Sequence, residues 1–319
     1  MSHYDSRSRR AGGALALLVL LASGCGNRTE LPQETKGGAI PATNTYNVKQ
    51  VWAGFAGASD ILLTSGSQVF VAFPAENEVR GYYRTSRDPR PNGVVIAGAQ
   101  PTFLAEIAGR ELVIAEQDPA RGGRVRIVDL RSLEEVAAFS DTSWVLLGGV
   151  AADDSAHVFV SDRERSVVRK YARTGELLAT VAEAGSGAGY VDRPGGLEWR
   201  APGRLLVADT GKNWAQALDP DAVNTAEFFL TGSDNPLGPF QGVADVAGDE
   251  EDNVYIADIA LGAVLKYTGA PAYDQRVDEN APAGSDGHLV LPIAISASAT
   301  LVFVLDGETG KIVTFELDR

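Results

Sequence analysis

Four aspartates recur along the chain at nearly regular intervals. Asp162, Asp209, Asp258 and Asp306 each end a short apolar run, and their residue numbers differ by 47, 49 and 48. Carboxylates are good ligands for calcium, but a carboxylate between a strand and a turn also accepts backbone N–H groups and fixes that turn. One aspartate per interval suits the second role, so we expect these side chains to maintain the fold.

Two further acidic segments could offer oxygen ligands to calcium. They are Asp249–Asp252 and the pair Asp153–Asp154, and each lies in a predicted hairpin. Neither has the alternating spacing of a dedicated calcium loop. We therefore expect solvated acidic loops rather than metal sites.

Other catalytic and metal-binding patterns are sparse. Beyond the N-terminal segment the only histidines are His157 and His288, too few for a histidine-based zinc site. The chain has no Gly-x-Ser-x-Gly elbow and no phosphate-binding loop. Glu198 lies in a predicted innermost strand, where it could serve catalysis or merely face a wet channel, and we favour the second. We therefore expect a protein without catalytic residues, metal or cofactor.

The four recurring aspartates belong to a strand pattern that occurs six times in the chain. In the copy at Val254–Asp258, the strand is followed by a glycine-containing turn and a second strand. The first residues of the copies are 43 to 49 apart. Those residues are Val69, Leu112, Val158, Leu205, Val254 and Val302. A large apolar residue follows thirteen positions later in five copies, which indicates one pairing register, and in the second copy a longer turn moves it to Ile127.

Apolar segments before and after these strands bring the first four units to four antiparallel strands, the number that we expect in every unit. Six such units predict an all-β, six-bladed β-propeller. The last unit has only three strands, so we expect Asn47–Trp52 to supply the fourth and close the ring. Gly149, Gly196 and Gly242 begin innermost strands, where crowding at the axis favours small residues.

The later units resemble NHL repeats. The segment Arg193–Leu197, followed by Arg204–Asn213, is similar to the family line R-P-x-G-L…V-A-D-T-x-N-N. In the first two units Phe73 and Glu116 replace the aspartate. The resemblance covers about residues 45–318 and implies a six-bladed propeller of the NHL or TolB-like kind, but it says little about activity. Calcium-dependent lactonases share this fold, which leaves a calcium-dependent hydrolase with Glu198 in the channel as the alternative.

A candidate binding surface is formed by two sets of turns that share one face. These are the turns between second and third strands and the turns that lead into the innermost strands. Arginine and aromatic residues are favoured at binding hot spots, although these residues could also be ordinary loop residues. The candidate residues are Arg163, Glu164, Arg165, Tyr190, Arg193, Lys212, Asn213, Trp214, Asn235, Gln241 and Glu308.

The N-terminus predicts export and lipid attachment. Residues 1–24 combine three arginines with the short apolar run Ala14–Ala22, typical of a signal peptide. Leu21–Cys25, which ends in the only cysteine, resembles a bacterial lipobox and implies cleavage before Cys25 and its acylation. An ordinary secretory signal with an incidental cysteine is the other reading. We expect a flexible tether over residues 25–44 and the propeller over residues 45–319.

Charge limits the possible partners. The net charge of −14 becomes −16 once residues 1–24, with three arginines and one aspartate, are removed. Such an acidic surface repels nucleic acid and offers no basic patch for anionic lipids. We therefore expect membrane attachment to depend on the acyl chains at Cys25. We expect a monomer on the periplasmic or outer-membrane face of a Gram-negative envelope. There it would bind a protein, peptide or glycan, or serve as a scaffold in an envelope assembly.

Overall fold

The computed structural model describes residues 44–85, 91–118, 122–200 and 203–318. The contacts divide the chain into two units, Met1–Ala42 and Thr43–Arg319, and only the second is described below. The expected signal peptide, Cys25 and nearly all of the tether lie outside the described residues. In the part of the chain that is described, no helix has the length and apolar character needed to cross a membrane.

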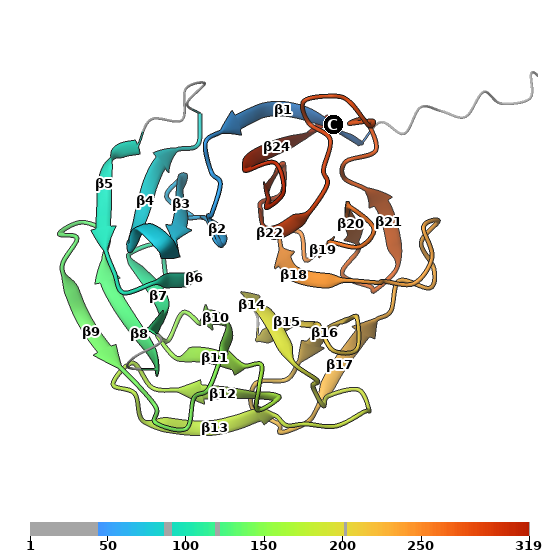
Figure 1. Cartoon of the computed structure of the whole chain (residues 1–319). Coiled ribbons are helices and arrows are strands. Elements are labelled where there is room, and N and C mark those ends of the chain that lie inside the picture. The colour runs from blue at the N-terminus through green and yellow to red at the C-terminus, as the bar shows by residue number, and fades with distance from the viewer. Residues whose placement is uncertain (1–43, 86–90, 119–121, 201–202, 319) are drawn as a thin grey trace, which may run out of the picture. The chain divides into compact units, whose positions relative to one another are not determined.

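Six four-stranded antiparallel sheets surround a common axis, as expected for a six-bladed propeller (Figure 1). Blades 1 to 3 comprise β2 (Asp60–Leu63), β3 (Gln68–Phe73), β4 (Glu78–Tyr83), β5 (Pro91–Ala97); β6 (Pro101–Ile107), β7 (Glu111–Asp118), β8 (Gly122–Asp129), β9 (Glu135–Phe139); β10 (Leu147–Ala152), β11 (Val158–Asp162), β12 (Val167–Tyr171) and β13 (Leu177–Ala182). Blades 4 to 6 comprise β14 (Pro194–Arg200), β15 (Arg204–Asp209), β16 (Trp214–Leu218), β17 (Ala226–Leu230); β18 (Val243–Gly248), β19 (Val254–Asp258), β20 (Ala263–Tyr267), β21 (Tyr273–Arg276); β22 (Pro292–Ala297), β23 (Leu301–Asp306), β24 (Lys311–Asp318) and β1 (Thr45–Ala53). A short 3₁₀ helix, η1 (Pro74–Glu76), connects β3 and β4.

The sequence repeat corresponds to the second and third strands of each blade. The thirteen-residue spacing becomes a directly opposed pair, as in Val158 with Tyr171 and Val254 with Tyr267. Blade 2 differs by one position, because Leu112 faces Val128 and the expected Ile127 faces Val113 instead. The longer β7–β8 connection allows this shift without turning the apolar side chains out of the core.

The ring is closed as expected by the N-terminal strand. β1 pairs with β24 from Thr45–Asp318 to Ala53–Lys311, with one bulge near Val48. Tyr46 and Trp52 on β1 are each 1% exposed, so this strand also contributes to the core between blades.

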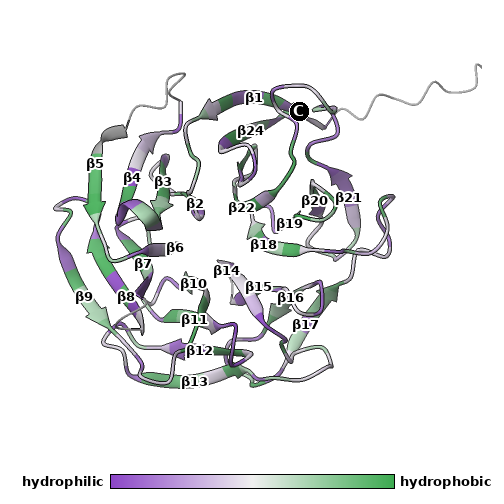
Figure 2. Cartoon of the chain, in the orientation of Figure 1, coloured by the Kyte–Doolittle hydropathy of each residue, from purple (hydrophilic) through white to green (hydrophobic). Residues whose placement is uncertain are grey.

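Hydrophobic residues are concentrated in the strands (Figure 2). Their buried side chains form clusters between neighbouring blades. The strand β21 is the exception, since its Tyr-Asp-Gln-Arg sequence is polar and mostly part-exposed. At the axis, a Cβ atom added to Gly149 would lie 2.6 Å from the carbonyl oxygen of Gly195 on the next blade. The small residues expected there are therefore required by the close approach of innermost strands.

Candidate functional site

The recurring aspartates hold turns together, as expected. Asp258 accepts hydrogen bonds from the backbone N–H of Gln241 at 2.7 Å and of Ala260 and Leu261 at 3.0 Å. It thereby joins the turn after its own strand to the segment that leads into β18. Asp162 and Asp306 make the equivalent bonds in their blades.

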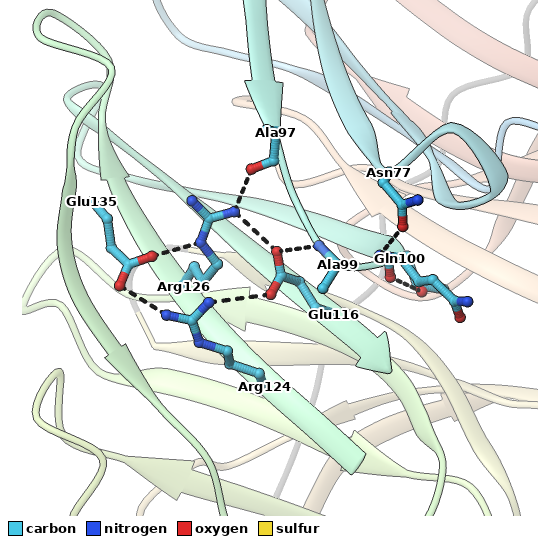
Figure 3. A network of polar contacts seen from close by, with 9 residues as sticks. Asn77, Ala97, Ala99, Gln100, Glu116, Arg124, Arg126 and Glu135 are labelled. Carbon is cyan, nitrogen blue, oxygen red and sulfur yellow. Dashed lines mark hydrogen bonds and ion pairs between the residues drawn. The ribbon is translucent and has the colours of Figure 1, made fainter. Parts of the chain in front are cut away.

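In blade 2 a glutamate takes over this role with two arginines (Figure 3). Glu116 is fully buried, and its Oε1 accepts hydrogen bonds from the backbone N–H of Ala99 at 3.0 Å and from Arg126 Nη1 at 2.9 Å. Arg126 also donates to the Ala97 carbonyl oxygen at 2.6 Å, while Arg124 lies 3.6 Å from Glu116 Oε2. The departure from aspartate therefore preserves the function of the turn.

In the acidic loop Asp249–Asp252, Glu250 and Glu251 are exposed as expected, but the expectation of a solvated loop was wrong for Asp249. Asp249 is fully buried and accepts hydrogen bonds from Asn253 Nδ2 and the Tyr255 hydroxyl, both at 2.7 Å. Asp252 accepts hydrogen bonds from Arg204 of the neighbouring blade at 2.8 and 2.9 Å. In blade 3 the Asp153 carboxylate likewise accepts the backbone N–H of His157, at 2.8 Å.

The central channel contains three carboxylates where the innermost strands converge. Asp60, Glu198 and Asp245 line a narrow cavity of about 50 Å³. Asp60 Oδ2 accepts the backbone N–H of Leu104 at 2.7 Å, and Asp245 Oδ2 accepts that of Ile295 at 2.9 Å. Each aspartate thus ties one blade to the next.

Burial raises the pKa of all three carboxyl groups. It raises the pKa of Glu198 to about 8 against the opposing charge of Arg200, whose Nη1 is 3.8 Å from Glu198 Oε1. The pKa of Asp245 rises to about 7, and that of Asp60 is raised well above its usual range by burial and then by the charge of Asp245. Such shifts also occur at catalytic sites, so the channel is a candidate site.

Sequence reasoning identified Glu198 but missed its two neighbours. Asp60 and Asp245 occupy equivalent register positions, opposite Ala72 and Ala257. A charged residue in an innermost strand, the signal used for Glu198, was present at both.

At one end the channel opens into a cavity of about 440 Å³. We call this the distal face; it carries the turns between first and second strands. Its walls include Glu106, Asp154, Glu198, Trp199, Arg200 and Glu250. The described residues contain no group of three or more His, Cys, Asp or Glu arranged for a metal. Calcium takes six to eight oxygen ligands, whereas the narrow channel contains three carboxylates, two of which already accept backbone N–H groups.

The opposite, proximal face carries the residues expected to bind a partner. Arg165, Arg193 and Asn213 lie on its turns, Arg163 is half-buried and Tyr190 is 39% exposed. Other residues expected on this surface make contacts within the protein. Lys212 Nζ is 3.1 Å from Asp209 Oδ2, and it donates a hydrogen bond to the Tyr190 carbonyl oxygen at 2.6 Å. Asn235 is 6% exposed and binds carbonyl groups within its own loop.

A groove of about 460 Å³ lies between blades 3 and 4 on this face. Its lining includes Ser166, Gly185, Val191, Asp192, Lys212 and Trp214. Trp214 stacks on Phe229 with ring centroids 5.0 Å apart, so its ring is held in place. The Arg193 backbone N–H donates to Ser166 Oγ at 3.0 Å, which places Arg193 at the edge of the groove. We call the groove with Val145, Leu146, Arg163, Arg165, Tyr190 and Arg193 the blade 3–4 surface.

The architecture defines a six-bladed β-propeller, and structural neighbours agree. A protein of unknown function from Bacteroides thetaiotaomicron superposes with a TM-score of 0.66 and 14% identity, over 86% of this chain and 76% of that one. The PQQ-bound aldose sugar dehydrogenase of Streptomyces coelicolor gives 0.63 and 12%, over 87% and 99%. A chain of a nidogen/laminin complex gives 0.56 and 16%, over 70% and 80%. The sequence matches no family model and no curated protein, so these likenesses concern the fold alone.

Proposed function

We propose that this protein is a lipid-anchored propeller of the Gram-negative cell envelope that binds a protein, peptide or glycan without catalysis. One observation carries the proposal: a groove of about 460 Å³ lies at the turns whose arginine and aromatic residues suggested a binding face. Trp214 lines it, and Arg193 and Tyr190 border it. Grooves that combine rigid aromatic rings with arginines are typical of binding surfaces.

A quantitative pull-down tests the binding surface. Full-length protein in detergent-solubilised envelopes would be compared with a variant carrying Arg163→Ala, Arg193→Ala and Trp214→Ala. The proposal predicts that at least one co-purifying species is lost from the variant. Identical partner profiles for a folded variant would contradict this location.

The anchor depends on the lipobox resemblance at Cys25 and needs its own test. Cells grown with labelled palmitate are expected to label the wild-type protein. Cys25→Ser is expected to abolish the label and move the protein from the membrane to the soluble envelope fraction. Label on the serine variant, or an unlabelled wild-type protein, would contradict lipid attachment.

The alternative is a calcium-dependent hydrolase or lactonase with its site in the channel. The favourable observation is Glu198, which lines both the narrow channel and the 440 Å³ cavity and has a raised pKa. The three channel carboxylates are too few for the six to eight oxygen ligands of calcium, and two of them already accept backbone N–H groups. Calorimetric titration with calcium discriminates the two functions, since the hydrolase requires heat of binding and a calcium-dependent rise in melting temperature.

A further inference from the structure

In the described parts of the chain, the arginines of the blade 3–4 surface lack acidic partners, whereas the lysines all have one. Each of the five lysines among the described residues has an ion pair. Arg163, Arg165 and Arg193 have no such partner in the described parts of the chain. On a protein of net charge −14, three unpaired arginines at one place form a local site for negative charge.

Two of these arginines lie side by side. A Cβ atom added to Gly148 would overlap both Arg163 Cγ and the Pro194 carbonyl oxygen, so the Arg163 side chain lies beside the start of β14, next to Arg193. Burial and then the charge of Arg193 lower the pKa of Arg163, while the nearby Glu164 opposes this without an ion pair. A bound anion would relieve the repulsion between the two guanidinium groups.

Exposed apolar side chains lie beside the arginine pair. The Arg163 backbone N–H donates to the Leu146 carbonyl oxygen at 2.8 Å, which places Leu146 and Val145 beside it. Their exposed fractions are 36% and 50%, and Tyr190 is 39% exposed on the groove side. A ligand that fits here carries negative charge next to apolar or aromatic groups.

We propose that the blade 3–4 surface binds an acidic peptide segment of a partner protein, with carboxylates at Arg163 and Arg193 and an aromatic or apolar side chain beside them. This inference rests on the proposed function and specifies its ligand. Guanidinium groups match carboxylates through two parallel hydrogen bonds. A long polyanion is disfavoured by the acidic remainder of the protein, and sulfated sugar would leave Val145 and Leu146 uncovered.

Selection from a random peptide display library on the detergent-solubilised full chain tests this proposal. Enriched peptides are expected to carry aspartate or glutamate next to phenylalanine, tyrosine, tryptophan or leucine. A synthetic copy should bind the Arg163→Ala/Arg193→Ala variant about tenfold more weakly or worse, and more weakly in high salt. The matched control is Arg110→Ala, which removes an exposed arginine from the distal face and should leave affinity unchanged.

Every other result overturns part of the account. No enrichment, or enrichment without an acidic excess, contradicts the acidic peptide. Equal binding by wild type and a correctly folded double variant contradicts the surface itself and with it the proposed function. A heparin fragment that displaces the peptide, binds more tightly and is lost in the double variant would replace peptide by sulfated glycan and leave the binding surface intact.

Discussion

The channel carboxylates show how single residues join the blades. Asp60 and Asp245 each accept a backbone N–H from the innermost strand of the following blade. Gly196 must be glycine here, because a Cβ atom would overlap the Asp245 carboxylate. The cost of this close packing is that the carboxyl groups are poorly hydrated and retain protons at unusually high pH.

The pH dependence of stability follows from Glu198. Its pKa of about 8 in the folded protein exceeds the usual 4.5, so the folded state binds this proton more tightly than the unfolded chain. Its contribution to stability is therefore present at low pH and is lost as the pH rises from about 4.5 to about 8. We expect Glu198→Gln to stabilise the protein at pH 9 by about 2–4 kcal/mol and to have little effect at pH 5.

Urea unfolding at both pH values measures this difference. Glu134→Gln, at an exposed turn residue, serves as the control and should change stability little at either pH. An equal effect of Glu198→Gln at pH 5 and pH 9 would show that the channel does not hold this proton.

At the scale of the element, the strand–turn–strand units of blades 2 to 6 each contain one buried carboxylate, whereas blade 1 has Phe73 at that position. In blade 2 the longer Glu116 side chain reaches the Ala99 backbone N–H and brings Arg126 with it. A buried charge that loses its partner is costly, whereas replacing both members of a pair costs much less.

Blade 2 therefore provides a double-mutant test. We expect Arg126→Met to destabilise the protein by about 3 kcal/mol, because Glu116 would lose its main cationic partner. Glu116→Gln combined with Arg126→Met should recover part of that loss in urea unfolding. A double variant no more stable than Arg126→Met would mean that the ion pair is not what anchors this turn.

The sequence was sufficient for elements with strong local patterns. The spacing of Val254 and its counterparts predicted the paired strands, and the missing last strand predicted closure by β1. The strand β21 was not predicted, because its residues are polar. It lies at the outer edge of its blade, where side chains are only partly buried and need not be hydrophobic. Asp249 was predicted to lie in a solvated loop, because the sequence does not reveal its buried hydrogen bond with the Tyr255 hydroxyl.

The candidate site was less accessible to sequence reasoning because its contacts cross between blades. Asp60 and Asp245 bond to residues 44 and 50 positions away. The turns predicted which residues share the proximal face, but not that Asn235 is consumed by its own loop. The groove arises only where the segment before β14 meets the β15–β16 turn.

At the scale of the whole molecule, the ring is held closed by β1. This strand pairs along β24 and buries Tyr46 and Trp52, and the Tyr46 hydroxyl hydrogen-bonds to the Tyr255 hydroxyl at 2.8 Å. Without it, β24 would become an exposed edge and two core clusters would open.

Deletions on either side of this boundary test the closure. Removal of residues 45–53 should lower the melting temperature by more than 10 °C, because loss of Trp52 alone is expected to cost about 3–5 kcal/mol. Removal of residues 27–43, which leaves Cys25 and β1 in place, should change it little. Similar losses from both deletions would contradict closure by β1.

The most direct test of the central claim is site-specific photocrosslinking in intact envelopes. A photoreactive phenylalanine analogue would replace either Tyr190, beside the groove, or Tyr83, 57% exposed at the end of β4 on the distal face. The account predicts a discrete crosslinked partner from position 190, lost on Arg163→Ala/Arg193→Ala, and none from position 83. The same crosslinked species from both positions, or none from position 190, would contradict a binding surface between blades 3 and 4.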